Sequence, residues 1–499
     1  MEAVHPMKHR LILLLALIAS CVLHAAAPGR PNILFIYTDD QSQRTLGCYR
    51  EEGAWPWVRT PNIDRLAAEG VRFTTAYGAS WCSPSRACVM TGRLPHGIHG
   101  VHLNGVTAKG EAFDPSTAPF WPAALRKSGY QTALIGKWHI GQNAGHGVLW
   151  DHSAVWDQNV IKGDWYNDQD LAIDSAPPKT QPGYTTDVFT RLASDFIRRK
   201  HDKPWMLWLC YNAPHLPNTT HPRHKDLYAD AEVTTPADVF GPRPEKPGYM
   251  HDWSMFKRRP DGQPAYGGKS LPDTVRAYNR LVSAVDEGVG DLRRALEESG
   301  QLDNTLIIYT SDQGFAWGEH GYAWKVGPYD ACLRMPLIFR LSGVVAKGGV
   351  CRQPATIVDV APTLLGFAGV TPPHTMHGHD LRPLLRDPAA LTDRAVMMEH
   401  IGLRFGDARP EERSSKEINA KLYVPWWQFL RQGKYKYVNT LVPDEIEELY
   451  DLEADPHELK NLALDPANRA VLDEYRKRLL AELQRTEAGP VFTPTEPRR

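Results

Sequence analysis

Four apolar segments of this chain each end at a cluster of polar side chains that could do chemistry. In chain order, the clusters are Asp39 with Asp40, Lys137 with His139, His215, and Asp312 with Gln313. Carboxylate and amide oxygens bind hard cations, while histidine and lysine can move protons or bind anions. The spacing along the chain therefore predicts several strand ends that meet at one reactive site.

A further reactive group lies in the segment CSPSRACVMTG, which contains Cys82, Pro84 and Arg86 in a C-x-P-x-R arrangement. The residues that follow favour a short helix beginning near Cys82. Backbone N–H groups at the start of such a helix would point toward a bound anion. The alternative is an ordinary buried cysteine at the start of a helix.

The elements that position these groups read as alternating strands and helices. Strands are predicted by dense Ile, Leu, Phe and Tyr at residues 31–38, 130–136, 204–211 and 304–310. Helices are predicted by apolar residues three and four apart, or by correct end residues, at 61–69, 185–200 and 272–299. This order predicts an α/β fold with a large, mostly parallel sheet flanked by helices. Ligands bind at the carboxyl ends of strands in such sheets.

The pattern changes beyond about residue 390. Residues 394–399, 427–430 and 435–438 read as short antiparallel strands, and residues 472–483 read as a terminal helix. We therefore expect a catalytic domain over 30–389 and a smaller C-terminal α+β subdomain over 390–490.

The segment CSPSRACVMTG resembles the signature of formylglycine-dependent (type I) sulfatases, in the alkaline-phosphatase-like superfamily. The other clusters occur in the order of that family, and the resemblance extends over about residues 31–462. It implies hydrolysis of sulfate esters by a formylglycine (3-oxoalanine) made from Cys82. A formylglycine-generating enzyme, or an equivalent maturase, would be a partner. The hydrated aldehyde divides one difficult hydrolysis into two easier steps.

The carboxylates Asp39, Asp40 and Asp312 are hard oxygen ligands that favour one Ca²⁺ ion over zinc. By resemblance, Gln313 and the hydrated residue 82 complete its coordination. Gln313 departs from the family, where asparagine or histidine is more usual, but its amide still offers a carbonyl oxygen. Another interpretation of Asp40 is that it only caps the following turn.

The resemblance also assigns roles to the basic residues. Arg86, Lys137 and Lys325 would stabilise negative charge on the nucleophile and the sulfate. His139 would accept a proton during sulfate release, and His215 would protonate the departing oxygen.

Composition and the N-terminus limit the setting of this chemistry. The 57 Lys and Arg nearly balance the 58 Asp and Glu, so no basic field argues for nucleic acid. Residues 1–27 read as a cleaved signal peptide, and no stretch predicts a transmembrane segment. We expect an exported protein, periplasmic or secreted. Residues 18–21 also fit a lipobox, which would anchor the chain by a lipid on Cys21.

The substrate is the least specified part. We expect a sulfated carbohydrate, because an exported enzyme meets extracellular polysaccharides. Several aromatic residues in the insertions could stack on sugar rings or pack the insertions onto the domain, and both remain open. They are Trp150, Trp156, Trp165, Tyr166 and Trp253. Two other functions are also open: a phosphonate or phosphodiester hydrolase of the same superfamily, or an inactive glycan-binding relative.

Overall fold

A computed structural model describes residues 29–98, 119–141, 144–156, 164–401, 424–441 and 445–488. The predicted signal peptide and Cys21 lie outside the described residues. Within the described ranges, no helix is both long and apolar enough to cross a bilayer.

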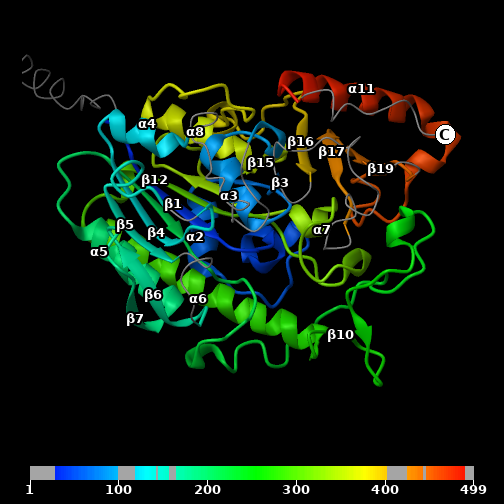
Figure 1. Cartoon of the computed structure of the whole chain (residues 1–499), viewed down its shortest axis with the longest axis horizontal. Coiled ribbons are helices and arrows are strands. Elements are labelled where there is room, and N and C mark those ends of the chain that lie inside the picture. The colour runs from blue at the N-terminus through cyan, green and yellow to red at the C-terminus, as the bar shows by residue number, and fades with distance from the viewer. Residues whose placement is uncertain are drawn as a thin grey trace, which may run out of the picture.

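A sheet of ten strands forms the centre of the molecule, in the order β14-β2-β13-β12-β1-β8-β4-β5-β6-β7 (Figure 1). The four strands predicted from the sequence are adjacent in it: β12 (Thr305–Ser311), β1 (Asn32–Thr38), β8 (Trp205–Cys210) and β4 (Gln131–Lys137). All three pairings among them are parallel, so their carboxyl ends share one edge. The prediction of a parallel centre is confirmed.

The edges of this sheet are mixed rather than parallel. On one side, β5 (His152–Trp156) is parallel to β4, but β6 (Asn167–Ile173) and β7 (Lys179–Tyr184) are antiparallel. On the other side, β13 (Leu337–Arg340) is antiparallel to β12 and to β2 (Val71–Phe73), and β14 (Gly349–Cys351) is parallel to β2. The insertion after β4 therefore extends the sheet.

Helices cover both faces of the sheet, as predicted (Figure 1). One face carries α2 (Pro61–Glu69), α5 (Thr185–Arg198) and α6 (Leu271–Glu298), and the other carries α3 (Cys82–Thr91), α4 (Trp121–Lys127) and α8 (Val360–Ala368). Alternate residues of β1 point to opposite faces and enter two separate apolar clusters. Burial on both faces explains why the central strands are continuously apolar.

Short elements connect these layers. They are β3 (Ala76–Tyr77), β9 (Lys257–Arg258), β10 (Pro264–Tyr266), β11 (Lys269–Ser270), α7 (Asp330–Leu333), β15 (Ala355–Thr356) and α9 (Arg382–Arg386). Strands β9, β10 and β11 form a small separate sheet that leads directly into α6.

A second, antiparallel sheet follows near the C-terminus. It consists of β16 (Val396–His400), β17 (Trp427–Gln432), β18 (Tyr435–Thr440) and β19 (Glu448–Asp451). Helix α11 (Arg469–Arg485) packs on β17 and β18. This confirms the predicted antiparallel sheet and terminal helix.

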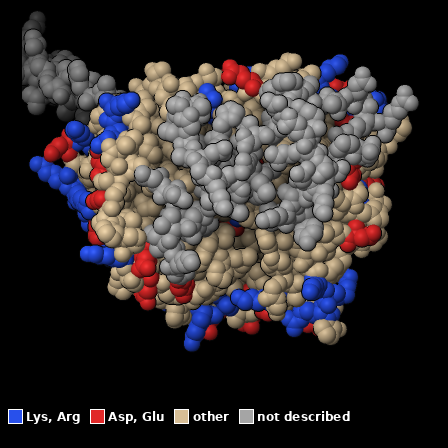
Figure 2. All heavy atoms as spheres, viewed as in Figure 1, with Lys and Arg blue, Asp and Glu red and all other residues tan. Residues whose placement is uncertain are grey.

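Charges of both signs are interspersed around the edge of the face drawn in Figure 2. Among the described residues, ion pairs at the surface include Arg126 with Asp151 at 2.7 Å and Arg198 with Glu298 at 2.9 Å. Neither sign dominates over α4 and α5, in keeping with the near-neutral composition.

Candidate active site

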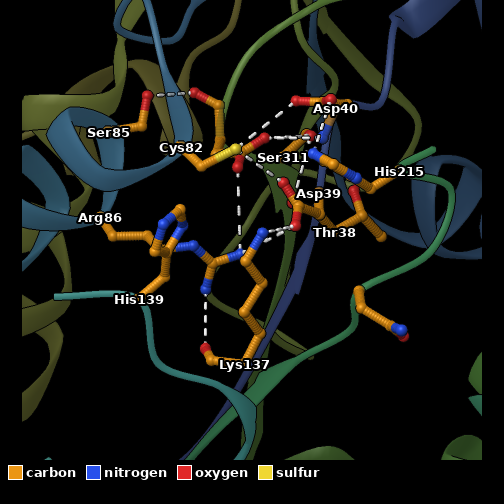
Figure 3. Close-up of polar contacts among 12 residues, drawn as sticks. Thr38, Asp39, Asp40, Cys82, Ser85, Arg86, Lys137, His139, His215 and Ser311 are labelled. Atoms are coloured by element: carbon orange, nitrogen blue, oxygen red, sulfur yellow. Dashed lines mark hydrogen bonds and ion pairs between the residues drawn. The ribbon is translucent and has the colours of Figure 1, made fainter. Parts of the chain in front are cut away.

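The sheet brings the predicted polar clusters together beyond the carboxyl ends of four adjacent strands (Figure 3). Asp39 and Asp40 follow β1, Lys137 ends β4, His215 follows β8, and Asp312 follows β12. Cys82 and Arg86 approach the same point from helix α3 (Figure 3). All except His215 are buried, so the cluster is a solvent-poor group of charges.

The first two carboxylates are fixed by the backbone around them. Asp40 has a φ of 66°, a conformation that few non-glycine residues adopt. Its N–H donates to Asp312 Oδ1 at 2.7 Å, and the Tyr278 hydroxyl donates to its carbonyl oxygen. The Asp39 N–H donates to the carbonyl of Ala213 at 3.2 Å, which ties β1 to the loop after β8. The strained turn aims both side chains at Cys82.

Cys82 is the first residue of α3, and its side chain is 1% exposed. Its Sγ lies 3.1 Å from Asp39 Oδ1 and 2.9 Å from Lys325 Nζ. The first turn of α3 is anchored by Ser85, whose hydroxyl donates to the Asp312 carbonyl at 2.5 Å and accepts from the Ala79 N–H at 2.8 Å. The helix thus holds residue 82 at the centre of the charged cluster.

Lys137 and Arg86 lie on the Asp39 side of this centre. Lys137 Nζ pairs with Asp39 Oδ2, and an Arg86 Nη donates to the Lys137 carbonyl at 2.8 Å. Gly136 precedes Lys137 with a φ of +106°, and a Cβ there would come within 2.0 Å of the Cys210 carbonyl. Only glycine permits β4 to approach β8 this closely and to turn Lys137 inward.

Lys325 and Gln313 lie on the Asp40 side. Lys325 Nζ is 2.5 Å from Asp40 Oδ1, and the Gln313 amide nitrogen donates to the same oxygen. Both residues are buried, at 3% and 0% exposure. Lys137 and Lys325, which are far apart in the sequence, therefore pair with Asp39 and Asp40 respectively.

The two histidines are placed differently. His139 is 2% exposed, with a φ of 58°, and its carbonyl accepts from the Ser83 hydroxyl at 2.7 Å. His215 is partly exposed, and its Nε2 lies 3.5 Å from Asp40 Oδ2. Burial, together with Lys137 and Arg86, holds the pKa of His139 well below its usual range. Burial also lowers the pKa of His215 to about 4, against the opposing effect of Asp40 and Asp39.

The carboxylates of the cluster respond oppositely to their surroundings. Burial alone would raise the pKa of Asp39, but Lys137, His215 and Arg86 hold it well below its usual range. Burial and the neighbouring Asp39 and Asp40 raise the pKa of Asp312 well above it. Ionisation of Asp312 is therefore opposed by the neighbouring carboxylates, and a bound cation would favour its ionised form.

A set of oxygen atoms in the cluster could hold such a cation. Ligand atoms of Asp39, Asp40, Cys82 and His215 lie within 4.8 Å of one another. Asp312 Oδ2 and Gln313 Oε1 are buried and have no hydrogen-bond partner in the part of the chain that the structure describes. Three carboxylates and an amide oxygen suit Ca²⁺ better than zinc, which prefers nitrogen and sulfur. We favour this oxygen set over one that includes His215, whose imidazole is a poor ligand for calcium.

The aromatic residues of the insertions divide into two groups. Trp150, Trp156 and Tyr166 are at most 1% exposed, so they pack the insertions onto the domain. Trp165 and Trp253 are only half-buried.

Three further half-buried aromatics near the site were not predicted. They form an aromatic wall, Trp81, Trp324 and Tyr266, in which Lys325 Nζ lies 4.5 Å from the Trp81 ring centroid. Trp324 lies 6.0 Å from Trp81 and 5.7 Å from Tyr266 between ring centroids. Trp81 adjoins Cys82 and Trp324 adjoins Lys325 in sequence, a proximity that could have indicated them.

Comparison with known proteins places this site in a family. Residues 31–370 match the family model described as Sulfatase. An N-acetylglucosamine-6-O-sulfatase of Bacteroides thetaiotaomicron is 32% identical, over 95% of this chain and 90% of the relative. A choline-sulfatase of Rhizobium meliloti is 28% identical, over 90% of this chain and 86% of the relative.

A solved structure shows the same fold. It is that of a protein in complex with its substrate D-glucosamine-2-N,6-O-disulfate, with a TM-score of 0.75 and 28% identity, covering 93% of this chain and 100% of that one. The family match spans most of the chain and includes every residue of the charged cluster. The chain is therefore a sulfatase of the alkaline-phosphatase-like superfamily.

Proposed function

We propose that this sulfatase hydrolyses sulfate esters of a carbohydrate, using a formylglycine made from Cys82 and one calcium ion. The observation that carries the proposal is the position of Cys82 Sγ, 3.1 Å from an aspartate oxygen and 2.9 Å from a lysine nitrogen. A side chain at this point can meet a cation and an anionic ester together. The Bacteroides relative, whose name specifies N-acetylglucosamine 6-O-sulfate chemistry, supports the substrate class.

The thiol itself is poorly suited to be the nucleophile. Burial and the adjacent Asp39 raise the pKa of Cys82 well above its usual range, in spite of Lys325 and Lys137. A thiol kept protonated is a weak nucleophile. Formylglycine would supply one hydroxyl of its hydrate for attack on sulfur and a second for releasing sulfate. The proposal therefore includes a formylglycine-generating enzyme or an equivalent maturase as a partner.

Calcium would be held by Asp39, Asp40, Asp312, Gln313 and residue 82. Asp312 Oδ2 and Gln313 Oε1 are buried and accept no hydrogen bond from a described residue, which supports this set, since buried polar atoms normally have hydrogen-bond partners. Calcium would supply positive charge for a sulfate oxygen and acidify the nucleophile.

The basic residues would bind and orient the ester. Lys137, Lys325 and Arg86 surround residue 82 and would neutralise the sulfate oxygens. His139, kept neutral by burial, suits a proton acceptor. His215 would donate its proton to the departing oxygen, and the negative charge of a bound ester would raise its pKa from about 4.

The alcohol part of the substrate would lie against the aromatic wall. Its three half-buried rings lie beside Lys325, and such rings bind the apolar faces of sugars. Export by the predicted signal peptide would bring the enzyme to such glycans.

Maturation of Cys82 is the direct test. The chain is produced together with a formylglycine-generating enzyme, and the tryptic peptide of residues 73–86 is weighed by mass spectrometry. We expect loss of sulfur and gain of an aldehyde at Cys82. Cys82→Ala should fold and release no sulfate, whereas Cys88→Ala, at a buried cysteine of the same helix, should retain activity.

Two results would overturn the proposal. One is sulfate release without formylglycine, either by Cys82→Ala or by wild-type protein in which Cys82 is still a thiol. The other is faster cleavage of a phosphate ester than of the sulfate ester of the same alcohol. The first contradicts the nucleophile, and the second contradicts the reaction.

A further inference from the structure

Trp165 contacts the candidate proton donor directly. It lies between β5 and β6, and its ring stacks on the His215 imidazole with centroids 4.5 Å apart and planes 13° apart. Trp156, a buried residue of β5, packs against it at 4.8 Å and 76°, in a T-shaped contact. The indole thus contacts both a buried residue of the sheet and a partly exposed histidine.

The backbone around Trp165 is fastened to the loop that carries His215. The Asn212 amide donates to the Trp165 carbonyl, and the Tyr166 hydroxyl donates to the His215 carbonyl. Asp164 accepts from the Tyr166 N–H at 2.7 Å, which closes the turn around Trp165. The two segments therefore form one unit, although about fifty residues separate them.

The imidazole itself has few polar restraints. His215 Nδ1 donates to the Leu216 carbonyl at 2.5 Å, which leaves Nε2 directed toward Asp40 Oδ2 at 3.5 Å. A single hydrogen bond to a neighbouring carbonyl permits the ring to swing about it. The flat indole face restricts that motion and keeps Nε2 over the reactive centre.

The same indole also contacts a sulfate-binding cation. Lys137 Nζ lies 5.0 Å from the Trp165 ring centroid, within the range of a cation–π contact. Trp165 therefore contacts both Lys137, which would hold the sulfate, and His215, which would protonate the leaving oxygen.

We infer that Trp165 is a positioning residue for leaving-group protonation, acting through His215 rather than by contact with substrate. The inference rests on the proposed role of His215 as proton donor. This inference replaces the sugar-stacking interpretation for Trp165, because the His215 imidazole already stacks on its ring.

Leaving-group dependence tests the inference. A series of aryl sulfates of similar size is used, with phenol pKa values from about 5 to about 10, because basic phenolates need a proton most. In Trp165→Leu, kcat/KM should fall about tenfold for the most basic phenol and less than about twofold for the most acidic. In Trp165→Phe, which keeps an aromatic face, the slope of log kcat/KM against phenol pKa should equal that of wild type. Trp253→Leu, at a half-buried tryptophan packed on Tyr322, should not change the slope.

The double variant with His215→Ala distinguishes positioning from packing. If Trp165 acts through His215, Trp165→Leu should add little to the loss caused by His215→Ala, since residues acting as a unit are non-additive. The inference would be overturned if Trp165→Leu lowered kcat/KM equally for every phenol of the series. It would also be overturned if the losses of Trp165→Leu and His215→Ala were additive in the double variant. Wild-type protein with verified formylglycine that releases no sulfate would instead overturn the proposed function. If Trp165→Leu folds poorly, Trp165→Met, which also lacks a flat ring, is measured in its place with the same expected loss.

Discussion

The charged side chains around Cys82 balance one another. In their ionised forms, Asp39, Asp40 and Asp312 supply three negative charges, and Lys137, Lys325 and Arg86 supply three positive charges. Each carboxylate of this group is within 4 Å of a cation, which makes its burial tolerable. Addition of a divalent cation would leave an excess of positive charge that suits an anionic ester.

The role of Gln313 can be tested by metal binding alone. Gln313→Ala removes the unpartnered amide oxygen, so it should weaken Ca²⁺ binding about tenfold or more. Gln313→Asn keeps a carbonyl oxygen and should bind more tightly than the alanine variant. Titration calorimetry of chelator-treated protein with CaCl₂ measures both, without reference to activity. Equal affinity of wild type and Gln313→Ala would exclude this residue as a ligand.

A buried histidine of the catalytic part is joined to two elements of the C-terminal region. His96 Nδ1 lies 2.7 Å from Glu399 Oε1, on β16, and Nε2 lies 3.0 Å from the Thr486 carbonyl, just after α11. Both partners are acceptors, so only the protonated ring can donate to both. Burial opposes this charge, but Glu399 dominates and raises the pKa of His96.

This contact predicts a pH-dependent stability. Since the folded pKa of His96 exceeds the unfolded value of about 6.5, its contribution is complete below that pH and is lost as pH rises through the folded pKa. His96→Gln leaves Glu399 buried without its cation, so it should cost about 3 kcal/mol at low pH. Thermal unfolding measured from about pH 6 to about pH 9 should show that the stability difference between His96→Gln and wild type becomes smaller as pH rises. His251→Gln, at a surface pair with Asp252, is the control and should leave the stability close to that of wild type. A gap that widens with pH would contradict the protonated pair.

The elements that the sequence predicts are those with a strong local pattern. The central strands are continuous apolar runs, and α5 and α6 show apolar residues every three or four positions. Strands β2, β13 and β14 have only three or four residues, too few for a pattern. Their pairing depends on contacts distant in sequence, so a single sequence does not predict it.

The same distinction holds for the site. The polar clusters were predictable because each directly follows an apolar strand, and adjacent parallel strands bring their ends together. The stack of Trp165 on His215 joins residues about fifty positions apart, and tryptophan has no spacing that indicates its partner. Contacts of that kind are properties of the packed molecule.

In the part of the chain that the structure describes, one hydrophobic core extends through both the catalytic and the C-terminal parts. One hydrophobic cluster includes Phe35 and Phe339 of the large sheet together with Phe429 and Tyr437 of the small one. A shared core of this kind predicts that both parts unfold in a single transition, rather than as separate domains.

A buried network of charged side chains also joins the catalytic part to the C-terminal sheet. Lys436 Nζ, on β18, lies 2.8 Å from Asp330 Oδ1, on α7, and 2.7 Å from Glu458 Oε1. Asp330 also accepts from the hydroxyl of Tyr77 at 2.9 Å, and Tyr77 is the last residue of β3, the strand that precedes α3. All three charged side chains are at most 7% exposed, so solvent cannot replace a missing partner.

Lys436→Met should therefore destabilise the entire protein. Removal of this cation leaves Glu458 and Asp330 buried beside each other, and Asp330 keeps only its longer pairs with Arg334 and Arg431 at 3.7 Å and 3.8 Å. The expected cost is about 3 kcal/mol. Lys434→Met is the matched control, because Lys434 is 43% exposed and solvent competes with its pair with Asp451. Calorimetry should show one transition, shifted down only in Lys436→Met, with activity lost in the same temperature range. Two transitions, or equal stability of both variants, would mean that the C-terminal sheet folds independently and that Lys436 does not join it to the catalytic part.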